Sequence, residues 1–205
     1  MDPTWQHPFT CVIAGPTGSG KTEWVKQFLK HLPEMISPVP KEVVWCYGIW
    51  QEGYHHFENK VTLHEGLPNT DHWTDKKPRL VIIDDLMSET DQSVTRLFCR
   101  GSHHLNISVM FIVQNLFSKN KEHRTISLNS HYLVLFKNPR DASQINHIGK
   151  QMYPGKLQYV QESYKDATSK PFGYLLVDLR QDTPDHLRLR TNIFPSEQQI
   201  VYIQK

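Results

Sequence analysis

The chain has 205 residues, and its 23 Lys and Arg residues against 21 Asp and Glu residues leave a formal net charge of +2. So small an excess excludes a protein that coats nucleic acid over its whole surface, and any polyanion must be held by a local basic patch. The length is that of one domain or of two very small ones, and a domain of this size buries about 70% of its unfolded surface. Such a chain folds without the help of disulfides.

The three cysteines, Cys11, Cys46 and Cys99, are an odd number without close spacing. This argues against a disulfide framework and against a zinc knuckle, and a reducing compartment is the expectation. The N-terminus has no basic segment followed by a signal-peptide core, and no stretch approaches the ~18 apolar residues of a membrane span. With a mean hydropathy of −0.53, the sequence predicts a soluble, intracellular protein that is not secreted.

Short apolar runs rich in β-forming residues alternate with helical patterns along most of the chain. Buried strands are predicted at residues 9–14, 43–47, 80–83, 107–113 and 132–136. Residues 50–77 are polar and rich in His and Gly, and they predict only a short strand at residues 61–63. Strands that alternate with helices are typical of an α/β fold with a mainly parallel central sheet.

Three helices are predicted between these strands. The first ends at Pro33 and turns one apolar face inward, formed by Trp24, Val25, Phe28, Leu29 and Leu32. The second begins with a capping box at Ser88, ends at Arg100 before Gly101, and buries Val94, Leu97 and Phe98. The third begins at Asp141 and buries Ile145, Ile148 and Met152.

After Lys170 the pattern changes to strict alternation. Leu175, Val177 and Leu179 precede a turn at residues 182–185, and Leu187 and Leu189 follow it. This predicts a terminal β-hairpin. The expected organisation is a core of residues 1–170 and a C-terminal hairpin, residues 171–205, that extends the same domain.

A phosphate-binding pattern, G-x-x-x-x-G-K-[ST], lies between the first strand and the first helix. It consists of Gly15, Pro16, Thr17, Gly18, Ser19, Gly20, Lys21 and Thr22. The glycines let successive backbone N–H groups point at phosphate oxygens, at the positive end of a helix. Lys21 supplies a cation for the β- and γ-phosphates, and the Thr22 hydroxyl is placed to bind Mg²⁺. The pattern predicts a Walker A site for a nucleoside triphosphate.

A Walker B pattern follows at residues 80–85, where four apolar residues of a buried strand end in Asp84 and Asp85. Asp84 is expected to hold Mg²⁺ through water, and Asp85 to orient or deprotonate the attacking water. The apolar run at 109–113 ends in Gln114. A strand parallel to the Walker A strand would bring this amide to the γ-phosphate, where it can sense the nucleotide.

Two arginines, Arg96 and Arg100, lie four residues apart on the outward face of the second helix. Arg100 is the candidate for an arginine finger, which in ring ATPases reaches the γ-phosphate held by the neighbouring subunit. The alternative is that Arg100 stabilises the negative end of its helix.

These motifs resemble a known family. The segments GPTGSGKT, LVIIDDL and VMFIVQN, with RGSHHLNIS before the last, resemble those of the FtsK/HerA superfamily of P-loop ATPases. The paired Asp residues are similar to those of the genome-packaging ATPases of poxviruses, virophages and Polinton/Maverick elements, and the resemblance covers residues 9–152. It implies a RecA-like (ASCE) P-loop NTPase in which the Gln114 strand lies between the Walker A and Walker B strands.

The resemblance also implies a function and partners. A ring of five or six copies would use ATP and Mg²⁺ to thread double-stranded DNA into a capsid, beside capsid vertex proteins and without a membrane. The place of action would be the host cytoplasm or nucleus, at assembling virions. The basic loop at residues 119–124, with Lys119, Lys121 and Arg124, is the candidate DNA contact. Arg180, Arg188 and Arg190 form a second basic group, which alternatively protects a sheet edge.

Other functions remain open at this point. A P-loop kinase for a nucleotide or metabolite would bind its acceptor at residues 50–77, but the sequence offers no arginine-rich lid. A GTPase would need N-K-x-D, and His123 stands where the Asp is required. An ATP-binding particle scaffold would keep the Walker residues without turnover.

Overall fold

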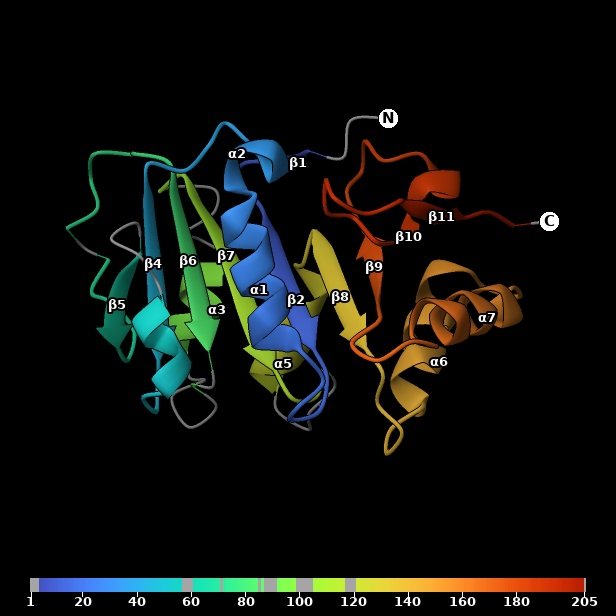
Figure 1. Ribbon diagram of the computed structural model, residues 1–205. Helices are drawn as coiled ribbons and strands as arrows, with labels where there is room; N and C mark the ends of the chain where they lie inside the picture. The colour runs from blue at the N-terminus through green and yellow to red at the C-terminus, as the bar shows by residue number, and fades with distance from the viewer. Residues whose placement is uncertain are drawn as a thin grey trace.

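The computed structural model describes residues 4–56, 61–70, 72–84, 86, 92–98, 105–116 and 121–204. Within them a nine-stranded sheet forms the centre of the molecule (Figure 1). Its strands are β2 (Thr10–Ala14), β4 (Glu42–Tyr47), β5 (Thr62–Glu65), β6 (Arg79–Asp84), β7 (Ile107–Val113), β8 (Tyr132–Phe136), β9 (Tyr174–Asp178), β10 (Leu189–Thr191) and β11 (Ile200–Tyr202).

The strand order is β11-β10-β9-β8-β2-β7-β6-β4-β5. The strands from β8 to β5 run parallel, whereas β9, β10 and β11 continue the sheet in antiparallel fashion. The predicted α/β class with a mainly parallel sheet is therefore confirmed. The strand order also confirms that the strand before Gln114, β7, lies between the Walker A strand β2 and the Walker B strand β6.

The central strands β2, β6, β7 and β8 are buried at every residue. Helices cover both faces of the sheet. The side chains on both sides of these strands are therefore buried, which explains why their sequences are continuous apolar runs and do not alternate between apolar and polar residues. All five strands predicted with this pattern form, to within one residue at each end. The short strand expected near residue 62 forms as the edge strand β5.

The helices form two layers, one on each face of the sheet (Figure 1). One layer has α1 (Lys21–Lys30) and α2 (Leu32–Met35), beside a small pair of strands, β1 (Trp5–Gln6) and β3 (Ile36–Ser37). The other layer has α3 (Gln92–Arg96), α5 (Lys121–Leu128), α6 (Ser143–Met152) and α7 (Leu157–Ala167). No helix in the described part is long and apolar enough to cross a membrane.

The first predicted helix is shorter than expected. It ends at Lys30, and Pro33 belongs to the first turn of α2. Proline fits there because the N–H groups of a first helical turn have no acceptor within the helix. The inward face is as predicted at Trp24, Val25 and Phe28, which are buried.

The second predicted helix is described at α3 and at the two residues that follow it. Val94 of α3, and Leu97 and Phe98 after it, are buried as expected. Ser88 and Arg100, its expected ends, lie outside the described residues. The third begins at Ser143, because the Asp141 carboxylate accepts hydrogen bonds from the Ser143 N–H and hydroxyl and so precedes the first turn.

Two helices were not anticipated. Residues 121–124, expected as part of a loop, are the first turn of α5, which buries Ile126. The helix α7 buries Val160, Ser163 and Ala167. Because Ser is polar and Ala is small, this face lacks the clear spacing of large apolar residues by which a helix is recognised in a sequence.

The predicted C-terminal hairpin forms, with Leu189 of β10 opposite Val177 of β9. Leu187, expected in the second strand, lies instead in a short 3-10 helix, η4 (Asp185–Leu187). Because β9 pairs with β8 and β10 pairs with β11, the hairpin is interior to the sheet.

Candidate functional site

The loop between β2 and α1 makes a tight turn in which two of its glycines adopt backbone angles that other residues rarely adopt. Gly18 and Gly20 have φ angles of +78° and +100°, which other residues adopt only with strain. A Cβ atom on Gly15 would lie 2.7 Å from Phe136 Cβ and from Ser19 Oγ. These three glycines therefore let the chain turn from the strand into the N-terminus of α1.

Lys21, the first residue of α1, reaches back over this loop. Its ammonium donates to the carbonyl oxygens of Gly15 at 2.7 Å and Pro16 at 3.0 Å. The side chain is buried, which strengthens its attraction for an anion compared with a lysine in water. A phosphate bound in the loop would compete with these carbonyls for the ammonium protons.

The loop fits the phosphates of a nucleotide. The Ser19 hydroxyl oxygen is buried and has no hydrogen-bond partner among the described residues. A buried hydroxyl without a partner is costly, and a phosphate oxygen would satisfy it. Together with the helix N-terminus and Lys21, this arrangement suits an anion in the curl of the loop.

Most of the described residues predicted for ATP and Mg²⁺ line one cavity of about 340 Å³, whereas Gly15, Pro16 and Ser19 of the loop do not. Lys21 and Thr22 come from α1, Asp84 from the end of β6, and Gln114 from the residue after β7. Ala14 pairs with Val113, and Asp84 pairs with Ile112, so the strand ends meet at the same edge of the sheet. Thr22 and Asp84 are the described residues that would hold Mg²⁺, whose preferred ligands are oxygens.

Asp84 is buried and accepts a hydrogen bond of 2.9 Å from the Tyr54 hydroxyl to its Oδ2 atom. Tyr54 lies in the 3-10 helix η1 (Glu52–His56) and is itself buried. Its ring packs against those of Trp45 and Tyr47 of β4, with ring centres 5.7 and 5.5 Å apart. These contacts fix the hydroxyl, and the hydroxyl orients the carboxylate.

Some predicted residues do not line this cavity or lie outside the described part of the chain. Asp85, Arg100, Lys119 and the side chain of Lys121 belong to the latter group. Arg96 is exposed on α3, and Arg124 is exposed on α5.

The structure adds residues that the sequence did not reveal. Gln51, Glu23 and Phe172 line the cavity, and Tyr54 holds Asp84. Gln51 follows β4, whose carboxyl end lies beside that of β6. Its place shortly after a predicted strand was the one feature of the sequence that could have indicated a position near the site. Phe172 comes from the segment between α7 and β9, far away in sequence.

The second basic group is not a surface patch. Arg190 is buried and donates to Asp178 Oδ2 at 2.6 Å, in a pair in which both side chains are almost fully covered. Arg188 and Arg180 are paired with Asp185 and Asp182. The expectation of outward charges that bind DNA or protect an edge is wrong for Arg190, because β10 is an interior strand.

Comparisons with known proteins support the fold. No protein-family model and no curated protein matches the sequence. The structure is similar to the genome packaging NTPase B204 from Sulfolobus turreted icosahedral virus 2 in complex with sulfate, with 12% identity, 97% of each chain covered and a TM-score of 0.59. The same NTPase in complex with ATP-gammaS gives a TM-score of 0.52 over 98% of each chain, at 12% identity.

A second similarity is to the cytoplasmic domain of the Type VII secretion ATPase EccC from Thermomonospora curvata. It has 12% identity and a TM-score of 0.54, and it covers 95% of this chain but 25% of that chain. At such identities the likeness is one of fold. It confirms the predicted α/β fold of a P-loop NTPase with a mainly parallel sheet.

Proposed function

We propose that this chain is an ATPase that drives double-stranded DNA into a viral or virus-like capsid. The observation that carries the proposal is the single cavity that gathers Lys21, Thr22, Asp84 and Gln114 at the ends of three adjacent strands. The similarity in fold to a genome packaging NTPase over 97% of both chains supports the biological role.

Each residue then has a distinct task. The N–H groups of the Gly15–Thr22 loop and Lys21 bind the β- and γ-phosphates, while Thr22 and Asp84 bind Mg²⁺. When Mg²⁺ is bound, it would neutralise part of the negative charge on the phosphates. Asp85 orients or deprotonates the attacking water, and Gln114 donates to a γ-phosphate oxygen and accepts a hydrogen bond from that water.

The proposed assembly is a ring of five or six copies that meets the capsid vertex proteins, at virions assembling in the host cytoplasm or nucleus. Arg100 reaches the γ-phosphate of the neighbouring subunit. Lys119, Lys121 and Arg124 contact the DNA backbone in the lumen. The exposure of Arg124 and the pairing of the hairpin arginines favour this choice of patch. A net charge of +2 suits a motor that grips DNA locally and releases it at each step.

The kinase alternative required residues 50–77 to bind an acceptor. In the described part of that segment, Tyr54 supports Asp84 and β5 extends the sheet. These contacts give much of the described segment a structural role. Gln51 lines the phosphate cavity, and it is the fold similarity to a genome packaging NTPase that favours the motor over the kinase.

The proposal is tested by ATP turnover with and without long linear double-stranded DNA. DNA is expected to raise turnover severalfold for the wild-type chain and for Lys165→Glu, an exposed control on α7, but far less for Arg124→Glu. Turnover that is independent of DNA, with no assembly in the presence of nucleotide, contradicts the motor. Absent turnover with intact ATP binding favours the particle scaffold.

The shared site is tested by mixing two inactive variants. Arg100→Ala and Lys21→Ala subunits are each expected to be inactive, but a mixture should recover part of the turnover because an intact cavity can meet an intact finger. No recovery at any ratio argues against Arg100 acting on its neighbour.

A further inference from the structure

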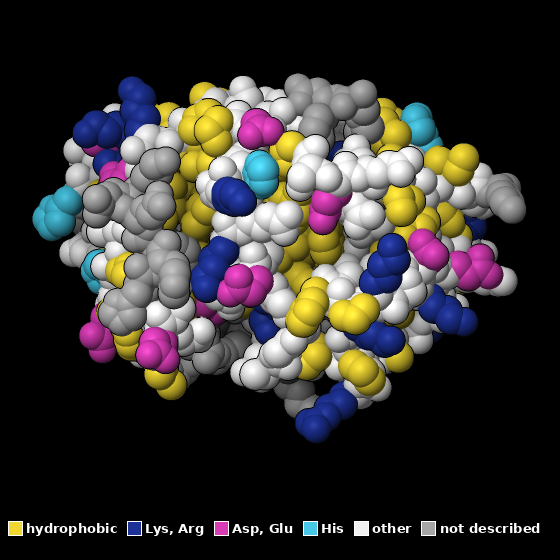
Figure 2. All heavy atoms as spheres, viewed as in Figure 1, with side chains coloured by type: hydrophobic (Ala, Val, Ile, Leu, Met, Phe, Trp, Pro, Cys, Tyr) yellow, Lys and Arg dark blue, Asp and Glu magenta, His cyan; other side chains and the backbone are white. Residues whose placement is uncertain are grey.

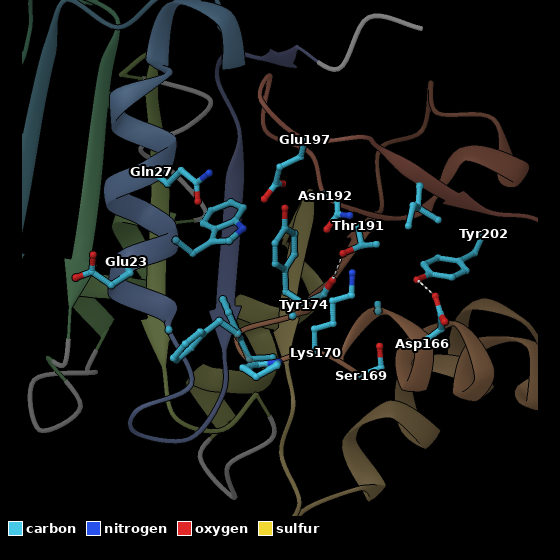
Figure 3. Close-up of a pocket in the computed structure, with 18 residues that line it drawn as sticks. Glu23, Gln27, Asp166, Ser169, Lys170, Tyr174, Thr191, Asn192, Glu197 and Tyr202 are labelled. Atoms are coloured by element: carbon cyan, nitrogen blue, oxygen red, sulfur yellow. Dashed lines mark hydrogen bonds between the residues drawn. The ribbon is translucent and has the colours of Figure 1, made fainter.

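A second and larger cavity lies directly beside the phosphate loop. Its volume is about 560 Å³, within the range that accommodates small organic ligands. It lies between α1 and the segments around residues 166–174 and 191–202 (Figure 3). In Figure 2 hydrophobic side chains form the floor of a hollow at this place on the same face.

This cavity adjoins the phosphate cavity. Gly20, Glu23 and Phe172 line both of them. A nucleotide with its β- and γ-phosphates in the loop carries its ribose and base past the first turn of α1, because they are attached through the α-phosphate. Glu23 and Phe172, which line both cavities, are therefore the residues that such a nucleoside would pass.

The lining combines aromatic surface with polar groups. Trp24 and Tyr174 pack edge to face on one wall, with ring centres 5.7 Å apart. Gln27 of α1, with Asn192 and Glu197 of the segment between β10 and β11, lies at the end away from the phosphate loop (Figure 3). An apolar cavity with a few polar groups at one end suits a flat heterocycle with hydrogen-bonding edges.

Phe172 is the unusual residue of this lining. Its side chain is 70% exposed, although phenylalanine is normally buried, and its φ angle of +61° lies in the left-handed region. The ring packs on Gly20, where a Cβ atom would lie 3.0 Å from Phe172 Cδ1. Strained residues gather at ligand-binding sites, where the surrounding structure holds them in place.

The turn that carries Phe172 is held rigidly. The Gly173 N–H donates to the Lys170 carbonyl at 3.1 Å, and Ser169 N–H donates to the Asp166 carbonyl at 3.0 Å. A Cβ atom on Gly173 would collide with the carbonyl oxygen of Ala167. The ring is thus presented to solvent at the junction of the two cavities by a backbone that has little freedom to move.

We infer that this cavity binds the nucleoside part of the nucleotide, and that Phe172 stacks on its purine base. The inference rests on the proposed ATP site, and it assigns to Phe172 the affinity of that site for the base. An exposed, pre-positioned aromatic ring loses little entropy when it stacks, and base–aromatic stacking contributes about 10-fold in affinity.

The test compares the binding of ATP and of inorganic triphosphate by titration calorimetry. Phe172→Ala is expected to weaken ATP binding about 10-fold and to leave triphosphate binding unchanged, whereas Phe172→Trp keeps ATP affinity. Leu128→Ala, which removes another exposed apolar side chain, is the matched control and should change neither. Equal loss for both ligands, or loss for neither, overturns the stacking role.

The same titrations separate this inference from the proposed function. Lys21→Ala is expected to lose affinity for both ATP and triphosphate. If it loses neither, the phosphate site itself is wrong, whatever Phe172 does. If Phe172→Ala changes self-association and leaves ATP affinity unchanged, the cavity receives a neighbouring copy, and the nucleoside site is rejected.

Discussion

The Tyr54 hydroxyl donates a 2.9 Å hydrogen bond to the carboxylate of Asp84, the buried acid at the end of the Walker B strand. Partners of this kind orient metal-binding groups, and their removal costs about 10- to 100-fold in metal affinity or activity. Tyr54 is therefore a positioning residue for the proposed Mg²⁺ site.

Tyr54→Phe is expected to raise the Mg²⁺ concentration for half-maximal turnover by about 10-fold, because the carboxylate loses its fixed orientation. ATP binding without Mg²⁺ should not change. Tyr159→Phe, which removes a hydroxyl bonded to the Tyr202 carbonyl, is the control. A lower melting temperature with an unaltered Mg²⁺ requirement would mean that Tyr54 is structural only.

Gln114 is exposed at the end of β7 and faces the cavity. Gln114→Ala is expected to lower turnover about 100-fold, by analogy with the loss of one transition-state hydrogen-bond donor, and to change ATP affinity little. Single-turnover hydrolysis and equilibrium binding measure the two effects separately. Gln161→Ala on α7 should change neither. A variant that binds ATP poorly but hydrolyses it normally at saturation would refute the sensor role.

The Arg190–Asp178 pair predicts a large effect on stability. Arg190→Met leaves the Asp178 carboxylate buried without its partner, and losses of about 3–5 kcal/mol are typical. Urea unfolding measures the free energy, and Arg190→Met combined with Asp178→Leu should recover much of it. Unchanged stability with weaker DNA binding would restore Arg190 as a DNA contact.

Stability is also expected to depend on His7. Burial lowers the pKa of His7 below its ordinary value of 6.5, and the neutral ring bonds the Asn106 carbonyl and the Ser108 hydroxyl. The unfolded chain therefore binds more protons than the folded chain just below pH 6.5. The stabilisation of the folded state by neutral His7 is thus complete above that pH and is lost as the pH falls through the lowered pKa.

Melting temperatures between pH 7.5 and pH 5 test this dependence. His7→Gln keeps polar groups at the site but cannot titrate, and it should show a smaller decrease on acidification than the wild-type chain. An equal decrease for both proteins would assign the pH dependence to titrating groups other than His7.

The central strands and the phosphate loop could be predicted because their signals are local. An apolar run such as that of β7 predicts a buried strand by itself, and the spacing from Gly15 to Thr22 fixes the loop. The strand order required the family resemblance, since the sequence does not say which strands are neighbours.

The remaining features depend on contacts between distant segments. Phe172 matters because its ring packs on Gly20, and Tyr54 because its hydroxyl reaches Asp84. Neither segment has a period that predicts such a contact. Arg190 was misjudged for a related reason: alternation predicts its face, but the pairing of β10 with β9 and β11 decides whether that face is covered.

The most direct measurement is the release of phosphate from ATP and Mg²⁺ by the wild-type chain and by Lys21→Ala, with circular dichroism to verify that both are folded. The wild-type chain is expected to turn over ATP, and Lys21→Ala to lose at least about 100-fold, because the cation of the phosphate cradle is gone. Equal phosphate release by the two folded proteins would contradict an ATPase site at this cavity.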